Sequence, residues 1–161
     1  MIEVNGLHKR YGDFVAVDNL SFKVERGQIL GFLGPNGAGK TTTMRILTGF
    51  IPATAGSATI AGFSVDEKPM EVKKRIGYLP ETPPLYTELT IHEYLKFISK
   101  IRNISAKERK DRIGWAMEKC SLESMANRLI RNLSKGYRQR VGLAQAILHK
   151  PEVLILDEPT V

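Results

Sequence analysis

A run of glycines between an apolar segment and a helix-forming segment restricts the fold of this chain most strongly. The run is Gly34-Pro35-Asn36-Gly37-Ala38-Gly39, and Lys40-Thr41 follows it directly. Residues 28–33 before it are mostly apolar and predict a strand, whereas residues 40–47 after it predict a helix closed by Gly49 and Pro52. A strand that passes through a glycine loop into a helix indicates an α/β fold.

The same residues match the phosphate-binding loop pattern Gly-x-x-x-x-Gly-Lys-Thr. Glycines let backbone N–H groups turn toward a phosphate, and the start of a helix adds a partial positive charge. We expect Lys40 to reach the terminal phosphates of ATP and Thr41 to bind Mg²⁺. A tight glycine turn that merely precedes a lysine is the alternative, and the strand-to-helix context disfavours it. The residues predicted to contact ATP in this segment are Gly34, Pro35, Asn36, Gly37, Ala38, Gly39, Lys40, Thr41 and Thr42.

An acidic pair, Asp157-Glu158, follows the aliphatic run of residues 153–156. The run predicts a buried strand, and carboxylates at the end of such a strand are poorly hydrated. Alone, an acidic pair in this position is more often a helix cap or a turn. In a chain with a phosphate-binding loop, it predicts that Asp157 holds Mg²⁺ and that Glu158 acts as general base or orients the attacking water. Lys40 and Glu158 are therefore the predicted catalytic residues.

Further elements follow from turn and capping signals. Strands are predicted at residues 2–9, 15–24, 57–65 and 76–79. Thr90 and Ser105 each precede a glutamate by three residues, which is the capping-box pattern of a helix start, and a third helix is predicted from Ser134 to His149. The predicted organisation is a β-rich core with the phosphate loop (1–84), a helical subdomain (85–150) and a final strand (151–161). The helix faces expected to be buried contain Ile91, Tyr94, Leu95, Ile98, Ile101, Ile113, Ala116, Met117 and Cys120.

Composition limits the remaining function classes. No apolar run approaches the roughly 18 residues that a membrane-spanning helix needs, and the single cysteine indicates a reducing, cytoplasmic setting. The net charge of +7 is compatible with nucleic acid, an anionic membrane surface or a small polyanion as partner. Seven basic and two acidic residues lie between Lys96 and Arg112, and we interpret them as a solvated helical face.

Residues 133–140, Leu-Ser-Lys-Gly-Tyr-Arg-Gln-Arg, make the interpretation specific. By itself Ser134 would be only a helix N-cap. The segment resembles the signature sequence of the ATP-binding cassette (ABC) family. Tyr11, the phosphate loop, the segment 77–80, the signature and the Asp157 strand also occur in the order typical of that family, so the resemblance covers essentially the whole chain.

This resemblance implies a P-loop NTPase (RecA-like) core with an N-terminal antiparallel β subdomain and an inserted helical subdomain. It implies that Tyr11 stacks on adenine and that Glu81 is a further Mg²⁺ ligand beside Thr41 and Asp157. Two such domains would enclose two ATP molecules, with Ser134, Gly136 and Tyr137 facing the ATP of the partner domain. The implied activity is ATP hydrolysis coupled to transport at the cytoplasmic face of the cell membrane. A second ABC ATPase domain and transmembrane permease subunits are the implied partners, and no nucleic acid is expected.

The chain departs from the family pattern at two places. Glu81 replaces the usual glutamine, and Lys135-Gly136-Tyr137 replaces Gly-Gly-Gln of the signature. Both variants resemble the exporter (ABC-2-like) branch with separately encoded membrane subunits, which includes multidrug, sodium and gliding-motility systems. We expect Tyr137 to pack rather than to signal.

Two alternatives to transport remain at the level of sequence. One is a soluble ABC-type ATPase that acts on nucleic acid or the ribosome, supported by the basic helices; the other is a nucleotide-binding domain without turnover. The absence of a heptad run between the phosphate loop and the signature disfavours the long coiled coil of DNA-repair relatives. The family pattern continues with a strand and a switch histidine after the acidic pair, so we expect this chain to be C-terminally incomplete and inactive in isolation.

Overall fold

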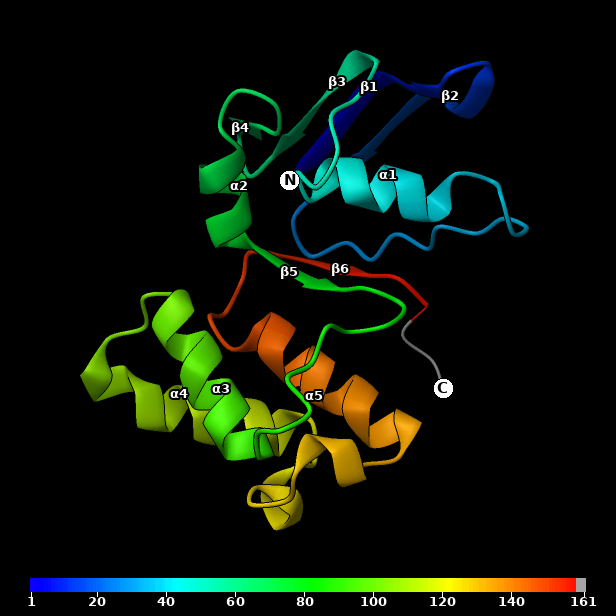
Figure 1. Cartoon of the computed structure of the whole chain (residues 1–161). Helices are drawn as coiled ribbons and strands as arrows, with labels where there is room; N and C mark the ends of the chain where they lie inside the picture. The colour runs from blue at the N-terminus through cyan, green and yellow to red at the C-terminus, as the bar shows by residue number, and fades with distance from the viewer. Residues whose placement is uncertain (159–161) are drawn as a thin grey trace. The chain divides into compact units, whose positions relative to one another are not determined.

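The computed structural model describes residues 1–158, so Pro159, Thr160 and Val161 at the end of the predicted final segment lie outside the described residues. The chain divides into two compact units, Met1–Ile76 and a unit that begins at Gly77. Helices and strands occur in both units (Figure 1).

An antiparallel sheet is the main feature of the first unit. It contains β1 (Ile2–Tyr11), β2 (Phe14–Val24), β3 (Ala55–Ile60) and β4 (Phe63–Ser64) in the order β2-β1-β3-β4. Pairing of β1 with β2, of β1 with β3 and of β3 with β4 is antiparallel throughout. The sheet confirms the expected antiparallel subdomain, although residues 57–65 form a short hairpin rather than one strand. Its buried side chains include Val4, Leu7, Val17, Val24, Ala58 and Ile60.

Two helices accompany this sheet. Helix α1 (Lys40–Leu47) has the predicted bounds and buries Thr43, Ile46 and Leu47. Helix α2 (Pro69–Arg75) is not predicted by the sequence pattern, because its only buried residue is Val72. Proline in its first turn is compatible with a helix start. Glu71 accepts hydrogen bonds from Lys74 and Arg75, which lower the pKa of the Glu71 carboxyl to about 2.

The prediction of a strand at residues 28–33 is wrong for this structure, which assigns no strand there. Ile29 is 100% exposed and Leu33 is 95% exposed. A strand is defined by ladder hydrogen bonds to a neighbour, and apolar sequence alone cannot supply the neighbour. Phe32 nevertheless contacts Phe22 of β2, with ring centroids 5.7 Å apart.

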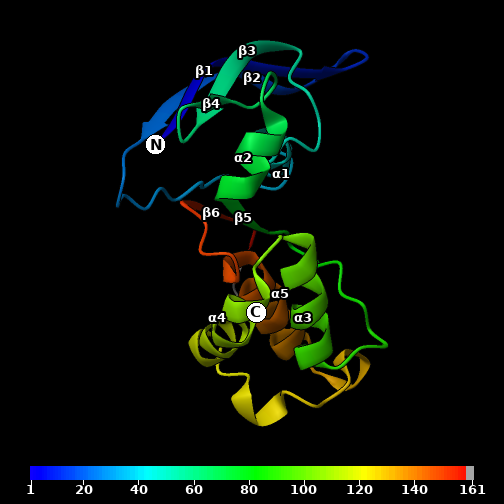
Figure 2. The ribbon, with the colours of Figure 1, turned by 90° about the vertical axis from the view of Figure 1, so that its left-hand side faces the viewer.

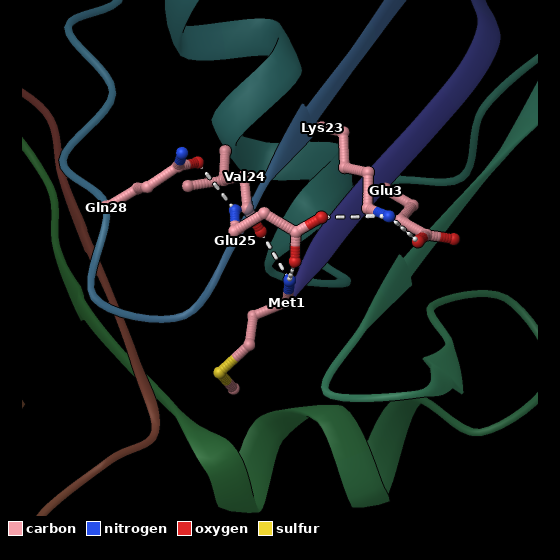
Figure 3. Close-up of polar contacts among 6 residues, drawn as sticks. All are labelled: Met1, Glu3, Lys23, Val24, Glu25 and Gln28. Atoms are coloured by element: carbon pink, nitrogen blue, oxygen red, sulfur yellow. Dashed lines mark hydrogen bonds and ion pairs between the residues drawn. The ribbon is translucent and has the colours of Figure 1, made fainter.

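A polar network fixes the turn that leads from β2 into this segment (Figure 3). The side-chain oxygen of Gln28 accepts the backbone N–H of Glu25 at 2.8 Å. Lys23 forms ion pairs with Glu25 at 2.9 Å and with Glu3 at 3.2 Å, and the ammonium group of Met1 donates to the carbonyl of Val24. These contacts raise the pKa of Lys23, because both carboxylates favour its charged form. The end of β2 is thereby tied to the start of β1.

A two-stranded sheet lies in the second unit. It is formed by β5 (Ile76–Leu79) and β6 (Val153–Leu156), both close to their predicted bounds. The strands run in the same direction in Figure 1, so the residues between them form one long crossover. The backbone N–H of Asp157 donates to the carbonyl of Leu79 at 2.9 Å and extends the pairing beyond β6.

The crossover contains the predicted helices α3 (Ile91–Ile101), α4 (Ala106–Lys119) and α5 (Lys135–Ile147), with two short 3₁₀ helices at Glu123–Met125 and Ile130–Asn132 (Figure 2). The helices enclose one apolar core. Ile98 is only partly buried, and the prediction that Ile101 is buried is wrong, because this last residue of α3 is 58% exposed. Burial raises the pKa of the Cys120 thiol to about 11. The core contains Ile91, Tyr94, Leu95, Ile113, Ala116, Met117, Cys120, Leu122, Ile130, Leu133, Val141, Ala144 and Leu148.

The capping predictions hold to different degrees. Thr90 forms the full capping box: its hydroxyl accepts the N–H of Glu93 at 3.2 Å, and the Glu93 carboxylate accepts the N–H of Thr90 at 2.9 Å. At Ser105 the hydroxyl accepts the N–H of Glu108, but the Glu108 carboxylate accepts the Ser105 hydroxyl, so that box is incomplete. Across residues 1–158, no helix combines the length and apolar character required to cross a bilayer.

Replacing Thr90 with alanine should lower the free energy of unfolding by about 1 kcal/mol, because α3 loses its N-cap acceptor. Urea unfolding followed by circular dichroism measures the loss, and Thr87→Ala at an exposed nearby position is the control. The hydrogen bond from Thr90 N–H lowers the pKa of Glu93 from 4.5, so this stabilising contact is present above pH 4.5 and is lost as pH falls through the lowered pKa. Equal stability of the two variants at neutral pH would contradict the capping role.

Candidate nucleotide-binding site

The glycine loop leads directly into α1. Residues 34–38 are exposed, and the helix begins at Lys40 with Gly39 as its N-cap. Gly37 and Gly39 have φ angles of 84° and 82°, which favour glycine. A Cβ atom on Gly39 would lie 2.3 Å from the carbonyl oxygen of Ala16 in β2, so a side chain cannot fit there without a shift of the backbone.

The first turn of α1 is suited to an anion. Its N-cap has no side-chain hydrogen bond, and the turn contains no acidic residue. The first N–H groups of a helix have no partner within the helix, and together with the helix dipole they favour negative charge. Thr41 and Thr42 lie in this turn and are half-buried. The loop and helix start therefore present donors where a phosphate group is expected.

The Lys40 side chain bends back over the loop. Its Nζ atom donates to the carbonyl oxygens of Gly34 at 2.7 Å and Pro35 at 2.9 Å. These acceptors are neutral, so the positive charge of the ammonium group stays available to an anion bound in the loop. The structure thus places Lys40 together with the predicted phosphate-binding residues.

Tyr11, the residue expected to stack on adenine, is the last residue of β1. Its side chain is 48% exposed, and the Nζ atom of Lys9 lies 5.0 Å from the ring centroid. Lys9 also donates to the carbonyl of Pro52 at 2.8 Å. An accessible aromatic ring in the first unit is compatible with base stacking.

The acidic pair follows β6 in the second unit. Asp157 is 2% exposed, and its Oδ2 atom is buried without a hydrogen-bond partner among the residues that the structure describes. A buried carboxylate oxygen without a partner is costly in an apolar setting, and a cation is one means of satisfying it. Glu158 is exposed and has a φ angle of 49°, which is uncommon for a residue other than glycine. Asp157 fits a magnesium ligand through this free oxygen.

The signature segment forms the N-terminus of α5. Ser134 is the N-cap, and its hydroxyl accepts the N–H of Tyr137 at 3.4 Å. A Cβ atom on Gly136 would meet nothing within 4 Å, so this position is open on the outside of the helix. Tyr137 packs against the helical core, as the sequence indicated, and the guanidinium of Arg140 lies 5.2 Å from its ring.

Glu81 lies in the loop after β5, and its side chain is exposed. The carbonyl of Glu81 accepts a hydrogen bond from Nε2 of Gln139 on α5 at 2.8 Å. Sequence reasoning missed Gln139. A signal was present, because Gln139, Gly142 and Ala146 follow the helical spacing and place two small residues beside one polar residue on a single face.

The predicted site residues fall into two groups. Tyr11, the glycine loop, Lys40 and Thr41 belong to the first unit, whereas Glu81, Ser134 and the acidic pair belong to the second. Within the second unit, the segment 79–81 brings Asp157, Glu81 and α5 together through two backbone carbonyls. Over the described part of the chain, no cluster of three or more His, Cys, Asp or Glu side chains forms a complete metal site.

Comparison with known proteins identifies the family. The model of the ABC transporter family matches residues 17–161. The chain belongs to the ABC transporter family. Its P-loop fold and its antiparallel β subdomain agree with solved ABC cassettes: a bacterial ABC transporter cassette solved as a dimer superposes with a TM-score of 0.89 at 26% identity, covering 99% of this chain and 75% of that chain.

Curated relatives of this ABC family member include ATP-binding proteins of transport systems. It is 42% identical over 160 residues to the bacitracin transport ATP-binding protein BcrA of Bacillus licheniformis, covering 99% of this chain and 51% of BcrA. It is 37% identical over 160 residues to the probable multidrug ABC transporter ATP-binding protein YbhF of Escherichia coli, covering 99% of this chain and 28% of YbhF. The chain therefore spans about half or less of these relatives.

Replacing Gly39 with alanine should destabilise the first unit more than the same change at Gly37. Both variants place a Cβ at positive φ, at a cost of about 1–2 kcal/mol, but only at Gly39 does that atom meet a backbone oxygen. Thermal unfolding followed by circular dichroism compares the two variants with the parent. If both variants lowered the melting temperature by the same amount, close packing of Gly39 on Ala16 would not constrain the loop.

Proposed function

We propose that this chain binds and hydrolyses ATP to drive the export of a substrate across a membrane, as the nucleotide-binding part of an ABC transporter. The observation that carries the proposal is the glycine loop itself. The loop precedes α1, whose N-cap has no side-chain hydrogen bond. Its carbonyl at Gly34 accepts a hydrogen bond from Lys40, and residue 39 must be glycine because a Cβ atom has no room there. Membership of the ABC transporter family supports ATP as the ligand.

The loop residues and Lys40 would bind the phosphates. Backbone N–H groups of the first turn of α1 donate to phosphate oxygens, and Lys40 exchanges the carbonyls of Gly34 and Pro35 for the terminal phosphates. Tyr11 would stack on the adenine ring. Thr41 of the first unit and Asp157 and Glu81 of the second are each proposed as ligands of Mg²⁺, which would supply positive charge for the β- and γ-phosphates.

Glu158 is proposed as the general base, which accepts a proton from the attacking water. Its carboxylate is exposed, follows directly after buried Asp157, and can accept a proton from the water that attacks the γ-phosphate. The water forms the new P–O bond, the bond from the γ-phosphorus to the β-phosphate oxygen breaks, and ADP leaves with the bonding electrons. Lys40 stabilises the negative charge during this transfer.

A second copy or a homologous domain is the proposed partner at the signature. Ser134 and the N–H groups around Gly136 lie at the N-terminus of α5, where an anion from another molecule can approach. The related bacterial cassette was solved as a dimer. We propose that the signature of each domain contacts the γ-phosphate bound by the other, and the dimer of the related cassette supports this arrangement.

Transmembrane permease subunits are proposed to dock on the surface of the second unit that carries exposed aromatic residues. Tyr86 is 56% exposed and stacks edge-on against Phe97 of α3, with centroids 5.3 Å apart. Ile101 at the end of α3 is also exposed. Apolar side chains gathered on a surface indicate a protein contact, and this contact would hold the chain at the cytoplasmic face of the membrane.

The basic residues of α3 and α4 do not favour nucleic acid as the partner. Arg109 donates to the carbonyl of Ile104 at 2.9 Å, and Arg112 lies 3.7 Å from the carboxylate of Glu108. Burial lowers the pKa of Arg102, so this side chain is not fully hydrated either. Part of the positive charge is therefore engaged within the helical unit instead of facing a polyanion.

Replacing Lys40 with alanine in the full-length protein should abolish ATP turnover, because the terminal phosphates lose their cation. Phosphate release in the presence of Mg²⁺ measures turnover, and isothermal titration measures ATP affinity. Lys68→Ala, which removes an exposed lysine from the same unit, is the matched control. Turnover by Lys40→Ala at the parental rate would show that the loop does not act through this residue.

Replacing Glu158 with glutamine should preserve ATP binding and stop hydrolysis, because the variant lacks the proton acceptor. ATP then stays between the phosphate loop of one domain and the signature of the other, so the full-length variant should become a dimer in ATP and remain a monomer without it. Light scattering after size-exclusion chromatography reads out the mass, and Glu152→Gln is the charge-matched control near the same strand. A monomer in saturating ATP would count against the dimer model and against Ser134 as a ligand.

A further inference from the structure

Helix α5 approaches β5 and the loop that follows it unusually closely. A Cβ atom on Gly142 would lie 2.7 Å from Cβ of Pro83 and 2.8 Å from Cδ1 of Leu79, and one on Gly77 would lie 2.3 Å from the carbonyl oxygen of Ala146. The two glycines remove the side chains that would otherwise separate helix and strand. The close contact involves both β5 and Pro83.

Gln139 lies one turn before Gly142 on the same face of α5. Its side chain is 7% exposed, and Nε2 donates to the carbonyl of Glu81 at 2.8 Å. Only the amide nitrogen can donate to a carbonyl, so this bond fixes the orientation of the amide. The other amide atom, Oε1, is buried without a hydrogen-bond partner among residues 1–158.

This arrangement is not the one that stability alone would select. An apolar side chain of similar size would fill the space without burying an unpaired oxygen, and its cost depends on whether the carbonyl left behind finds another donor. The carbonyl that Gln139 holds belongs to an exposed residue, so water could satisfy it instead. What the glutamine adds is a fixed position for the backbone of Glu81.

The segment 79–81 is held at both ends by elements of the proposed site. Asp157 N–H donates to the carbonyl of Leu79 at 2.9 Å, and Gln139 holds the carbonyl of Glu81 two residues later. Gln139 also lies on the helix whose N-cap is Ser134. Displacement of α5 would therefore pull on Glu81 relative to Asp157.

We propose that Gln139 is a positioning residue that sets the place of the Glu81 carboxylate by fixing its backbone, and so couples the signature helix to the ATP site. The proposal rests on the proposed ATPase function and adds to it a residue whose side chain holds the backbone carbonyl of Glu81. Gln139 acts only through Glu81, so its effect on turnover must require the Glu81 side chain.

A double-mutant cycle in the full-length protein tests this dependence. Gln139→Leu should lower Mg²⁺-dependent ATP turnover by about tenfold, in the range seen when outer-shell partners of a site are removed. In a Glu81→Ala background, which keeps the carbonyl but removes the carboxylate, the same change should have little further effect. Gln145→Leu is the matched control, because residue 145 points about 120° away around the helix.

Two further measurements do not depend on turnover. Hydrogen exchange of the nucleotide-free protein should become faster in the peptide that covers residues 79–85 in Gln139→Leu, and should be unchanged in Gln145→Leu. The melting temperature of Gln139→Leu should equal or exceed that of the parent. Faster exchange with a retained melting temperature supports positioning, whereas a lower melting temperature with unchanged exchange indicates a packing role and overturns the proposal.

The outcomes separate this proposal from the proposed function. If Gln139→Leu lowers turnover equally in both backgrounds, the residue does not act through Glu81 and the inference fails while the ATPase function stands. If Glu81→Ala by itself leaves turnover unchanged, the inference also fails. If the Lys40→Ala variant, with Gln139 and Glu81 unchanged, hydrolyses ATP at the parental rate, the proposed function itself is wrong.

Discussion

The close contact between the Gly39 backbone and the Ala16 carbonyl is the constraint on which the nucleotide site of the first unit depends. It brings the end of the glycine loop against β2 and thereby fixes where α1 begins. Because the N-cap is glycine, no side chain covers the first N–H groups of the helix. The same contact that packs the helix on the sheet thus leaves its positive end open to an anion.

A comparable constraint operates in the second unit, with a different chemistry. There the small residues Gly77, Gly142 and Ala146 let α5 approach β5. The buried side-chain amide of Gln139 donates a hydrogen bond to the backbone carbonyl of Glu81. The first unit offers donors to an anion, whereas in the second unit two backbone carbonyls connect the segment 79–81 to Asp157 and to Gln139. In both units, glycine determines which backbone atoms are close enough to be used.

Local sequence signals predicted much of this architecture, because their causes are local. The hydroxyls at Thr90, Ser105 and Ser134 mark helix starts by satisfying nearby N–H groups, and the bounds of α1 follow from the loop before it. Residues 28–33 were predicted incorrectly because a strand requires a pairing partner elsewhere in the chain. Helix α2 was missed because one buried valine gives no apolar period. The hydrogen bond of Gln139 depends on a close approach between segments 58 residues apart in sequence, which no local pattern reveals.

The burial of Cys120 has a practical consequence for experiments on this chain. Its thiol is the only one in the sequence, lies within the helical core and has a pKa raised to about 11. At neutral pH almost none of it is thiolate, the form that reacts with maleimides and disulfides. A cysteine introduced on the surface can therefore carry a fluorophore or a spin label in an otherwise native background, without first removing a residue that the core packs around.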